Sequence, residues 1–281
     1  MKPLPFKIPK PHQDAFYFQI DDGLVFYDKL HQHEEIQLSY IEKGEGTLLV
    51  GDKINYYRPG DVLVIGSHLP HVFKSDYEIS ESRMLTLFFT KESFGKNFFK
   101  LEELSELHHF FNQAKHGFKV IDDLENYKSY FLQLENSSKL CQFLILLQLL
   151  KMTSTANYES LSSFIYDKKY SDNEGRRMRR VFEFTMNQFD KEISLNSVSE
   201  VANMSKNAFC KYFKKRTNKT YIQFLNELRI EHACKLLQNN SEFTIAEIAE
   251  RSGFVNLSNF NRQFKTNLGM TPLSYRKNTA Q

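Results

Sequence analysis

Residues 245–276 read IAEIAERSGFVNLSNFNRQFKTNLGMTPLSYR, and this stretch decides the fold of the C-terminal half of the chain. A short helical pattern is followed by a turn at Gly253-Phe254 and by a second helical pattern that carries Phe260 and Phe264 four residues apart. The same features occur once before, between residues 195 and 220, at an offset of 50 residues that grows to 51. The matched pairs are Leu195/Ile245, Val198/Ile248, Ser199/Ala249, Phe209/Phe260, Lys211/Arg262, Phe213/Phe264, Lys214/Lys265 and Thr220/Thr271. The C-terminal half is therefore predicted to be a tandem repeat of one small helical unit.

A repeated helical unit whose second helix is apolar on one face and basic on the other suits the recognition of duplex DNA. Two such helices on one chain can enter two successive major-groove segments on one face of the duplex. Between the copies, residues 221–238 (YIQFLNELRIEHACKLLQ) are predicted to form one spacer helix. These 18 residues span roughly 27 Å, slightly less than the distance between successive major grooves, so packing offsets or a bend in the DNA must supply the remainder.

Helix caps and the paired phenylalanines indicate which side chains of each unit face outward. Ser194 and Ser205 are predicted N-caps in the first unit. Phe209, Tyr212 and Phe213 of the first unit and Phe260 and Phe264 of the second are predicted to face the core. That leaves on the outward faces Lys206, Asn207, Cys210 and Lys211 in the first unit and Leu257, Ser258, Asn261 and Arg262 in the second. Asn, Lys and Arg carry the donors and acceptors that read base edges, whereas Ser and Lys mostly hold phosphates.

Charge is distributed unevenly between the two halves of the chain. The 281 residues carry a formal net charge of only +3, yet from Arg176 onward there are 18 Lys and Arg against nine Asp and Glu. Residues 1–175 hold 19 Lys and Arg against 25 Asp and Glu. A basic half joined to an acidic half, in a chain long enough for two domains, indicates a polyanion-binding module attached to a domain with another task.

The remaining composition excludes several classes of protein. Cys141, Cys210 and Cys234 are odd in number and lack the spacing of a disulfide framework or a cysteine zinc site. The N-terminal residues MKPLPFKIPKPH contain no apolar leader segment, and no apolar run reaches the length of a membrane span. We therefore expect a cytoplasmic protein with no membrane partner.

The motifs of the C-terminal half resemble those of a known family. RIEHACKLLQ and the stretch quoted first, together with SVSEVANMSKNAFCKYFKKRT before them, are similar to the C-terminal domain of AraC/XylS-type transcription regulators. The resemblance covers about residues 176–277 and includes Gly253-Phe254, Phe264-Lys265, Gly269, Pro272 and Tyr275-Arg276. One departure is Asn218, which stands where a glycine often closes the first unit, and Asn tolerates the left-handed conformation of such a cap.

This resemblance implies which side chains contact DNA. The base-facing residues would be Asn207, Cys210, Lys211, Leu257, Ser258, Asn261 and Arg262. The phosphate contacts predicted beside them are Ser205, Lys206, Lys214, Asn256 and Lys265. Double-stranded DNA and RNA polymerase are the expected macromolecular partners, and activation of transcription is the expected outcome.

The N-terminal half is predicted to begin as β-structure and to continue as helices. Residues 23–89 contain the short strands IQLSYI, GTLLV, INYY and DVLVI, separated by Gly- and Pro-containing turns, which is typical of a sandwich or small barrel. From Lys91 the hydrophobic period is helical. The predicted fold class is α+β, with a β-barrel over 1–90, a helical segment over 91–152, a linker over 153–175 and an all-α domain with two helix-turn-helix units over 176–281.

The last helix of the N-terminal half, residues 139–152, is apolar over more than half of its circumference. One stripe of it consists of Leu140, Phe143, Leu144, Leu147 and Leu150. Such a helix must be buried in a bundle or against a second subunit, and we predict that it forms a homodimer.

Closely spaced polar residues mark a candidate effector site in the β-region. His31 and His33 lie two residues apart, Gln37 shares their side-chain parity, and His71 follows Leu69-Pro70. This pattern resembles the cupin barrel that many AraC-type regulators use as an effector domain, and the resemblance places His31, His33, Gln37 and His71 at the barrel mouth. In metal-binding cupins the position of Gln37 is usually an acidic ligand, which argues against a metal.

Three interpretations of these four residues compete. They form satisfied structural groups at the rim of a sheet, they bind a small polar effector such as a sugar, or they hold a metal. We prefer the sugar-like effector, because grouped polar side chains in an aromatic-rich barrel suit a polyhydroxylated ligand, and we expect no metal and no cofactor. The favoured function is a ligand-responsive transcription regulator that is not an enzyme, and the alternative is a metal-dependent cupin enzyme fused to a DNA-binding domain.

Overall fold

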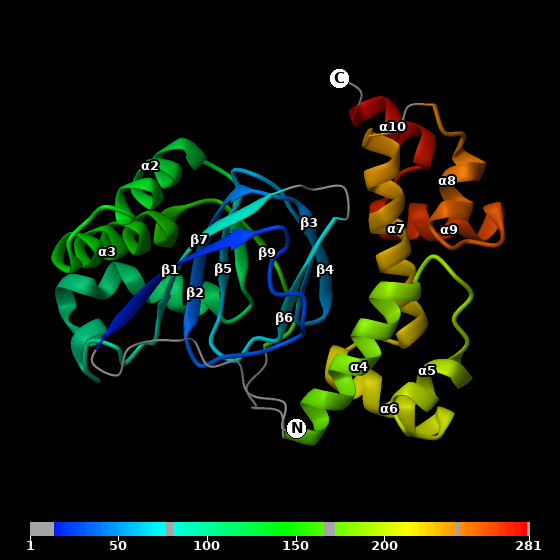
Figure 1. The fold of residues 1–281 in the computed structure, drawn as a ribbon, viewed down its shortest axis with the longest axis horizontal. Helices are drawn as coiled ribbons and strands as arrows, with labels where there is room; N and C mark the ends of the chain where they lie inside the picture. The colour runs from blue at the N-terminus through cyan, green and yellow to red at the C-terminus, as the bar shows by residue number, and fades with distance from the viewer. Residues whose placement is uncertain (1–13, 77–80, 166–171, 240–241, 280–281) are drawn as a thin grey trace. The chain divides into compact units, whose positions relative to one another are not determined.

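The computed structural model describes residues 14–76, 81–165, 172–239 and 242–279. The chain divides into two compact units, Met1–Asp172 and Asn173–Gln281 (Figure 1). The first unit is β-rich and the second is built of helices alone in its described part, which confirms the α+β fold class. None of the described helices combines the length and the apolar character needed to cross a membrane.

The first unit is built on two antiparallel sheets. The larger sheet has six strands, which in spatial order are β1 (Phe16–Gly23), β7 (Ser82–Phe89), β2 (Ile36–Lys43), β5 (Val62–Ile65), β8 (Phe118–Val120) and β9 (Tyr158–Ser160). The smaller sheet has three strands, β4 (Lys53–Tyr57), β3 (Gly46–Val50) and β6 (His71–Ser75). The four strands predicted from the sequence, now β2 to β5, are all present.

One core lies between the two sheets. It contains Ile41, Leu63, Ile65 and Met84 from the larger sheet and Leu48, Val50, Tyr57 and Phe73 from the smaller one. Because side chains alternate along a strand, Gln37 and Ser39 share this inner side of β2 with Ile41. The polar groups of β2 therefore enter the barrel rather than the solvent.

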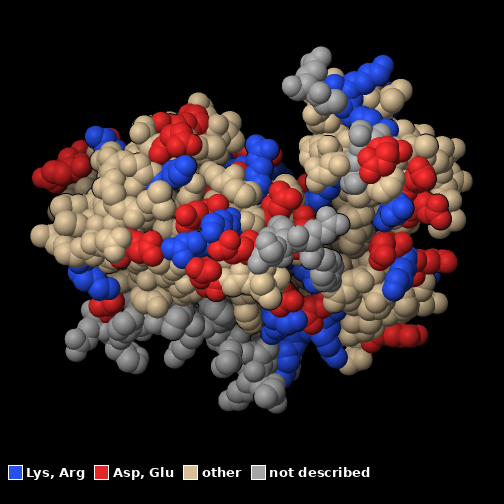
Figure 2. Space-filling view, turned by 45° about the horizontal axis from the view of Figure 1, so that its top comes forward, with Lys and Arg blue, Asp and Glu red and all other residues tan. Residues whose placement is uncertain are grey.

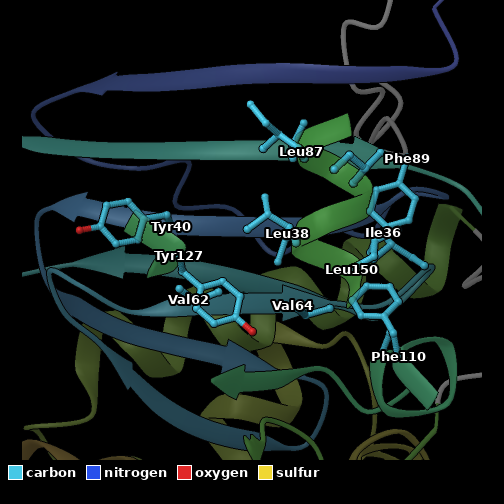
Figure 3. Packing of buried hydrophobic residues seen from close by; sticks show 14 of the residues in the cluster. Ile36, Leu38, Tyr40, Val62, Val64, Leu87, Phe89, Phe110, Tyr127 and Leu150 are labelled. Carbon is cyan, nitrogen blue, oxygen red and sulfur yellow. The ribbon is translucent and has the colours of Figure 1, made fainter. Parts of the chain in front are cut away.

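A second core covers the outer face of the larger sheet. Leu38, Tyr40, Val62 and Val64 meet the helices α1 (His108–Ala114), α2 (Leu124–Leu134) and α3 (Lys139–Thr155) there (Figure 3). In this cluster Phe110 belongs to α1, Tyr127 to α2 and Leu150 to α3. Since both faces of the sheet are buried, β2 and β5 contain apolar residues at almost every position.

The boundaries predicted within the N-terminal half differ from those of the structure. The segment 91–152 contributes β8 to the barrel sheet and begins with two 3₁₀ helices, η1 (Phe98–Lys100) and η2 (Glu102–Leu107). The linker expected at 153–175 contains regular structure in its first part, because α3 extends to Thr155 and β9 pairs with β8. Strands of three residues carry too short a pattern to be recognised without their partners, so the sequence did not reveal them. Residues 1–13 and 166–171, which the predicted barrel and linker include, lie outside the described residues.

The second unit contains seven helices over its described residues. They are α4 (Asp172–Gln188), α5 (Leu195–Val201), α6 (Lys206–Thr217), α7 (Tyr221–Asn239), α8 (Ile245–Arg251), α9 (Leu257–Leu268) and α10 (Pro272–Thr279). Helix α7 is the predicted spacer, and its 19 residues span roughly 28 Å. The pair α5 and α6 lies toward one end of α7, and α8, α9 and α10 lie toward the other (Figure 1).

The helix ends lie where local signals in the sequence predicted them. Ser194 and Ser205 cap α5 and α6 through hydrogen bonds from backbone N–H groups of their first turns. Asn218 ends α6 in the left-handed conformation, with φ of 56°, as Gly269 ends α9 with φ of 73°. The two copies therefore close in the same way, although one uses Asn and the other Gly.

Candidate functional site

The predicted inward-facing phenylalanines of the helical unit are all buried, whereas Tyr212, predicted with them, is half-buried. Phe209 and Phe213 pack on Tyr221 and Phe224 near the start of α7, with ring centroids 5.3–5.7 Å apart. Phe260 and Phe264 belong to a separate cluster that includes Ile230, Ala233, Cys234 and Leu237 from the other part of α7. Each helix-turn-helix unit thus has its own core on a shared helix.

The two turns have the same backbone geometry. Asn203 lies between α5 and α6 with φ of 51°, and Gly253 lies between α8 and α9 with φ of 82°. A Cβ atom at Gly253 would approach the carbonyl oxygen of Phe189 to 2.4 Å, so glycine is required there by contact as well as by conformation. The Arg229 side chain also packs at this turn, where it donates hydrogen bonds of 2.7 Å to the carbonyl oxygens of Phe189 and Lys191.

The predicted DNA-contacting residues lie on the outer faces of α6 and α9 or at their N-termini. All of them are exposed except Cys210, which is half-buried. Ser205 and Asn256 are N-caps, and the Oδ1 atom of Asn256 accepts hydrogen bonds from the backbone N–H groups of Ser258 and Asn259. Arg262 donates a 2.8 Å hydrogen bond to Asn259, which holds one edge of the guanidinium on the helix surface. The structure therefore brings together these residues as two exposed helix faces, and their contacts with DNA stay predictions.

Acidic and basic side chains are interspersed on the face of the molecule drawn in Figure 2. On that face the basic excess of the C-terminal unit does not form one continuous positive surface.

The three predicted histidines of the first unit form one cluster. A pair of backbone hydrogen bonds between His31 and His71, of 3.1 and 2.9 Å, brings their rings to a centroid distance of 4.2 Å. The His33 ring lies 5.0 Å from that of His71 and 5.9 Å from that of His31. One nitrogen of each ring is placed so that the three nitrogens lie within 4.8 Å of one another.

Main-chain carbonyls determine the tautomer of each ring. The Nδ1 atoms of His31, His33 and His71 lie 2.8 Å from the carbonyl oxygens of Lys29, Glu35 and Leu69, respectively. Since a carbonyl only accepts, each Nδ1 must carry the proton, and each Nε2 then presents a lone pair. The Nε2 atom of His71 is buried without a hydrogen-bond partner. This arrangement, with one nitrogen tied to a carbonyl and the other left as a base, is the one that metal-ligating histidines adopt.

Burial keeps the rings of His33 and His71 neutral. Desolvation is the largest cause that lowers the pKa of His33 to about 4, and it lowers the pKa of His71 well below the ordinary value. Neutral imidazole is the form that binds a metal ion. His33 and His71 are therefore in the form that can bind a metal ion at neutral pH.

Gln37 completes the group from inside the barrel. Its Oε1 atom lies 3.3 Å from Nε2 of His33, and its Nε2 donates a 3.0 Å hydrogen bond to Ser39, whose hydroxyl is 2.9 Å from that of Thr86. With Nδ1 of His33 protonated, Oε1 and Nε2 are two acceptors that face each other. A cation between them resolves this conflict, and so does exchange of the amide oxygen and nitrogen of Gln37.

The burial of the site bears on whether it can hold an ion or a sugar. His33, Gln37 and His71 are only 4%, 3% and 0% exposed. A carbohydrate could reach these groups only if the barrel opened, whereas an ion needs nitrogen ligands at about 2.1 Å and no further space. The geometry thus favours the metal interpretation over the sugar-like effector that the sequence analysis preferred for these four residues.

Two family models match this chain, one on each unit. Residues 19–88 match a cupin domain and residues 198–278 match a helix-turn-helix domain. The chain is 24% identical over 266 residues to an uncharacterized HTH-type transcriptional regulator, YdeC, of Bacillus subtilis, covering 92% of this chain and 89% of the relative. It is 25% identical to the HTH-type transcriptional activator RhaR of Mannheimia succiniciproducens, covering 88% and 86%.

The chain belongs to the AraC family of helix-turn-helix transcriptional regulators and has an N-terminal cupin domain. Both relatives are regulators and not enzymes, in agreement with the prediction that this regulator is no enzyme. A solved structure with 26% identity is the DNA-binding domain of AdpA in complex with a target DNA, which covers 35% of this chain and 87% of that chain at a TM-score of 0.33.

One exposed side chain of the regulator's helical unit was not predicted from the sequence. Val255 precedes the N-cap of α9 and is 94% exposed, and Leu257, which begins α9, is 43% exposed. Val255 follows the buried Phe254, so the turn itself directs it outward. A β-branched apolar residue in the turn directly before a recognition helix is the sequence signal that could have found it.

Proposed function

We propose that this regulator binds two successive major-groove segments of an operator through α6 and α9. The observation that carries the proposal is the pair of exposed, capped helices, each with its own core, at separate parts of the rigid helix α7. The base-facing and phosphate-facing residues are those predicted from the sequence. Val255 and Leu257 add an apolar surface at the start of α9 that suits the methyl group of thymine.

The test is selection of binding sites from a random duplex pool, followed by footprinting. We expect two protected segments about one helical turn apart on the same face of the DNA. Lys211→Ala should lose sequence preference in one segment and Arg262→Ala in the other. A single short footprint, or no selected sequence, would refute the two-helix mode.

We further propose that the regulator acts in the cytoplasm as a homodimer and recruits RNA polymerase as an activator. Dimerisation through α3 is supported by Leu140 and Leu144, which are 66% and 56% exposed, while Leu150 is buried in the core. Only part of the predicted apolar stripe is thus available to a second subunit. Reporter transcription with and without the regulator gene distinguishes activation from repression.

The cupin domain is proposed to sense its ligand at the histidine cluster, and a divalent transition-metal ion fits this cluster best. His31, His33 and His71 would hold it through Nε2, with Oε1 of Gln37 as a weaker neutral ligand. The ion would supply a link between three segments of the barrel. A small polar effector such as a sugar remains the alternative, and it requires the barrel to open.

Metal analysis of the purified protein and thermal unfolding after chelation test this assignment. Added zinc or manganese should raise the unfolding temperature of the chelated protein, and His33→Ala should remove that response. The matched control is His116→Ala, which changes a half-buried histidine outside the cluster. An unfolding temperature that a sugar raises and that metals leave unchanged would support the alternative.

A further inference from the structure

An open cavity of about 700 Å³ lies at the surface of the first unit and shares no residue with the histidine cluster. Helix α1, the end of β8 and the junction between α3 and β9 form its wall. The lining residues are His109, Gln113, Ile121, Asp122, Ser154, Thr155, Ala156, Asn157 and Tyr158. A volume of this size matches pockets for small organic molecules and is far larger than an ion requires.

Two acceptor atoms of this wall are buried without a donor. Gln113 is only 7% exposed, and its Oε1 atom has no hydrogen-bond partner. The carboxylate of Asp122 accepts hydrogen bonds through Oδ2 from the backbone N–H and the side-chain amide of Asn157, at 3.2 and 2.9 Å, whereas Oδ1 is buried and unpartnered. A molecule that fills the cavity must therefore bring hydrogen-bond donors.

The negative charge of the wall favours a cationic hydrogen-bond donor. Asp122 contributes a carboxylate, and the 17-residue helix α3 ends at Thr155, so the negative end of its dipole also lies here. Neither Lys nor Arg is among the lining residues. Ile121 and the ring of Tyr158, which are 56% and 39% exposed, provide apolar surface for a hydrocarbon chain and an aromatic face for a cation.

We propose that this cavity binds a small organic ammonium compound. Its N–H groups donate to Oδ1 of Asp122 and Oε1 of Gln113, and its carbon chain lies against Ile121 and Tyr158. The site is separate from the cupin ligand cluster, and the regulator thus has a second input.

The position of the cavity suits control of the DNA-binding unit, a role that rests on the proposed function. The segment that follows β9 is held to the barrel, because Asp52 accepts hydrogen bonds from Ser162 and from the backbone N–H of Ser163. Leu161 is buried in the inner core beside it. An ammonium ligand at Asn157 and Tyr158 would thus contact the chain three residues before this anchored segment.

The experiment uses the full-length regulator and putrescine as the probe, with butanediol and succinate as neutral and anionic compounds of the same chain length. We expect putrescine to shift the side-chain amide resonance of Gln113 saturably and to raise the unfolding temperature. The two control compounds should do neither. No response to putrescine, or an equal response to all three compounds, overturns the proposal.

Two substitutions localise the response. Asp122→Asn keeps an acceptor for Asn157 and removes the charge, so it should weaken putrescine binding about tenfold. The matched control is Asp123→Asn, which changes the neighbouring exposed carboxylate at a φ of 53° that Asn tolerates. Gln113→Leu lacks the reporting amide, so it is tested by thermal unfolding alone: putrescine should no longer raise its unfolding temperature, even if Asp122→Asn fails to fold. Equal losses in both aspartate variants contradict the site. DNA binding measured on the same samples without putrescine tests the proposed function separately.

Discussion

Val255 offers a sharp test of how α9 meets DNA. Its side chain is 94% exposed in the free protein, so nearly all of its apolar surface is available for burial against a base. Val255→Ala removes two methyl groups, each worth about 0.8 kcal/mol when fully buried. We therefore expect this variant to lose up to ~1.6 kcal/mol, or about 15-fold in affinity, on a selected operator that contains thymine at the contacted step.

Replacement of thymine by deoxyuridine isolates the contact, because it removes only the methyl group from the DNA. At one position the wild-type protein should lose about 0.8 kcal/mol from this replacement, and Val255→Ala should lose much less. Fluorescence anisotropy with four combinations of protein and duplex measures this coupling. Val25→Ala, at a 60% exposed valine of the cupin unit, is the control and should bind like the wild type. Equal sensitivity of both proteins to deoxyuridine at every thymine would refute the assignment of Val255.

Other expected outcomes concern base reading, dimerisation and helix capping. Arg262→Ala should reduce the free energy of operator binding by about 1–3 kcal/mol and relax the preference at one base pair. Lys214→Ala should weaken binding to all sequences alike and lower the slope of log affinity against log salt by about one. Both are measured by DNA titration at several salt concentrations. Leu144→Asp should dissociate the dimer in sedimentation experiments without unfolding, because Leu144 is 56% exposed. The hydrogen bonds from the backbone and side chain of Thr244 lower the pKa of Glu247, so this carboxylate stabilises α8 at neutral pH and loses that effect as the pH falls through its lowered pKa. Circular dichroism should show weaker acid sensitivity in Glu247→Gln.

Each of these outcomes has a result that contradicts it. Uniform losses for Arg262→Ala across all sequences would show a phosphate contact rather than a base contact. An intact dimer of Leu144→Asp would place the interface elsewhere. Leu147→Asp would be a poorer test, since Leu147 packs against the core and its replacement threatens the fold. Identical acid unfolding of wild type and Glu247→Gln would remove the role of the capping box.

Most of the helical unit was predictable because its signals are local. The caps Ser194 and Ser205, the closing residue Asn218 and the buried phenylalanines all depend on spacings of four residues or fewer, which the chain displays directly. Because the unit is repeated, the same pattern of caps and phenylalanines could be recognised twice in the sequence. The exposure of Val255 was not predicted, because exposure in a turn depends on how the flanking residues pack.

In the cupin unit, packing between distant segments determined the geometry of the histidine cluster, which the sequence alone did not specify. His31 and His71 are 40 residues apart, and only their backbone pairing makes them neighbours. The burial of His33 and His71 and the pairing of the short strands β8 and β9 are equally products of long-range contacts. Local patterns encode helices and their ends, whereas the closure of a barrel and the chemistry inside it arise from pairings that no short window of sequence contains.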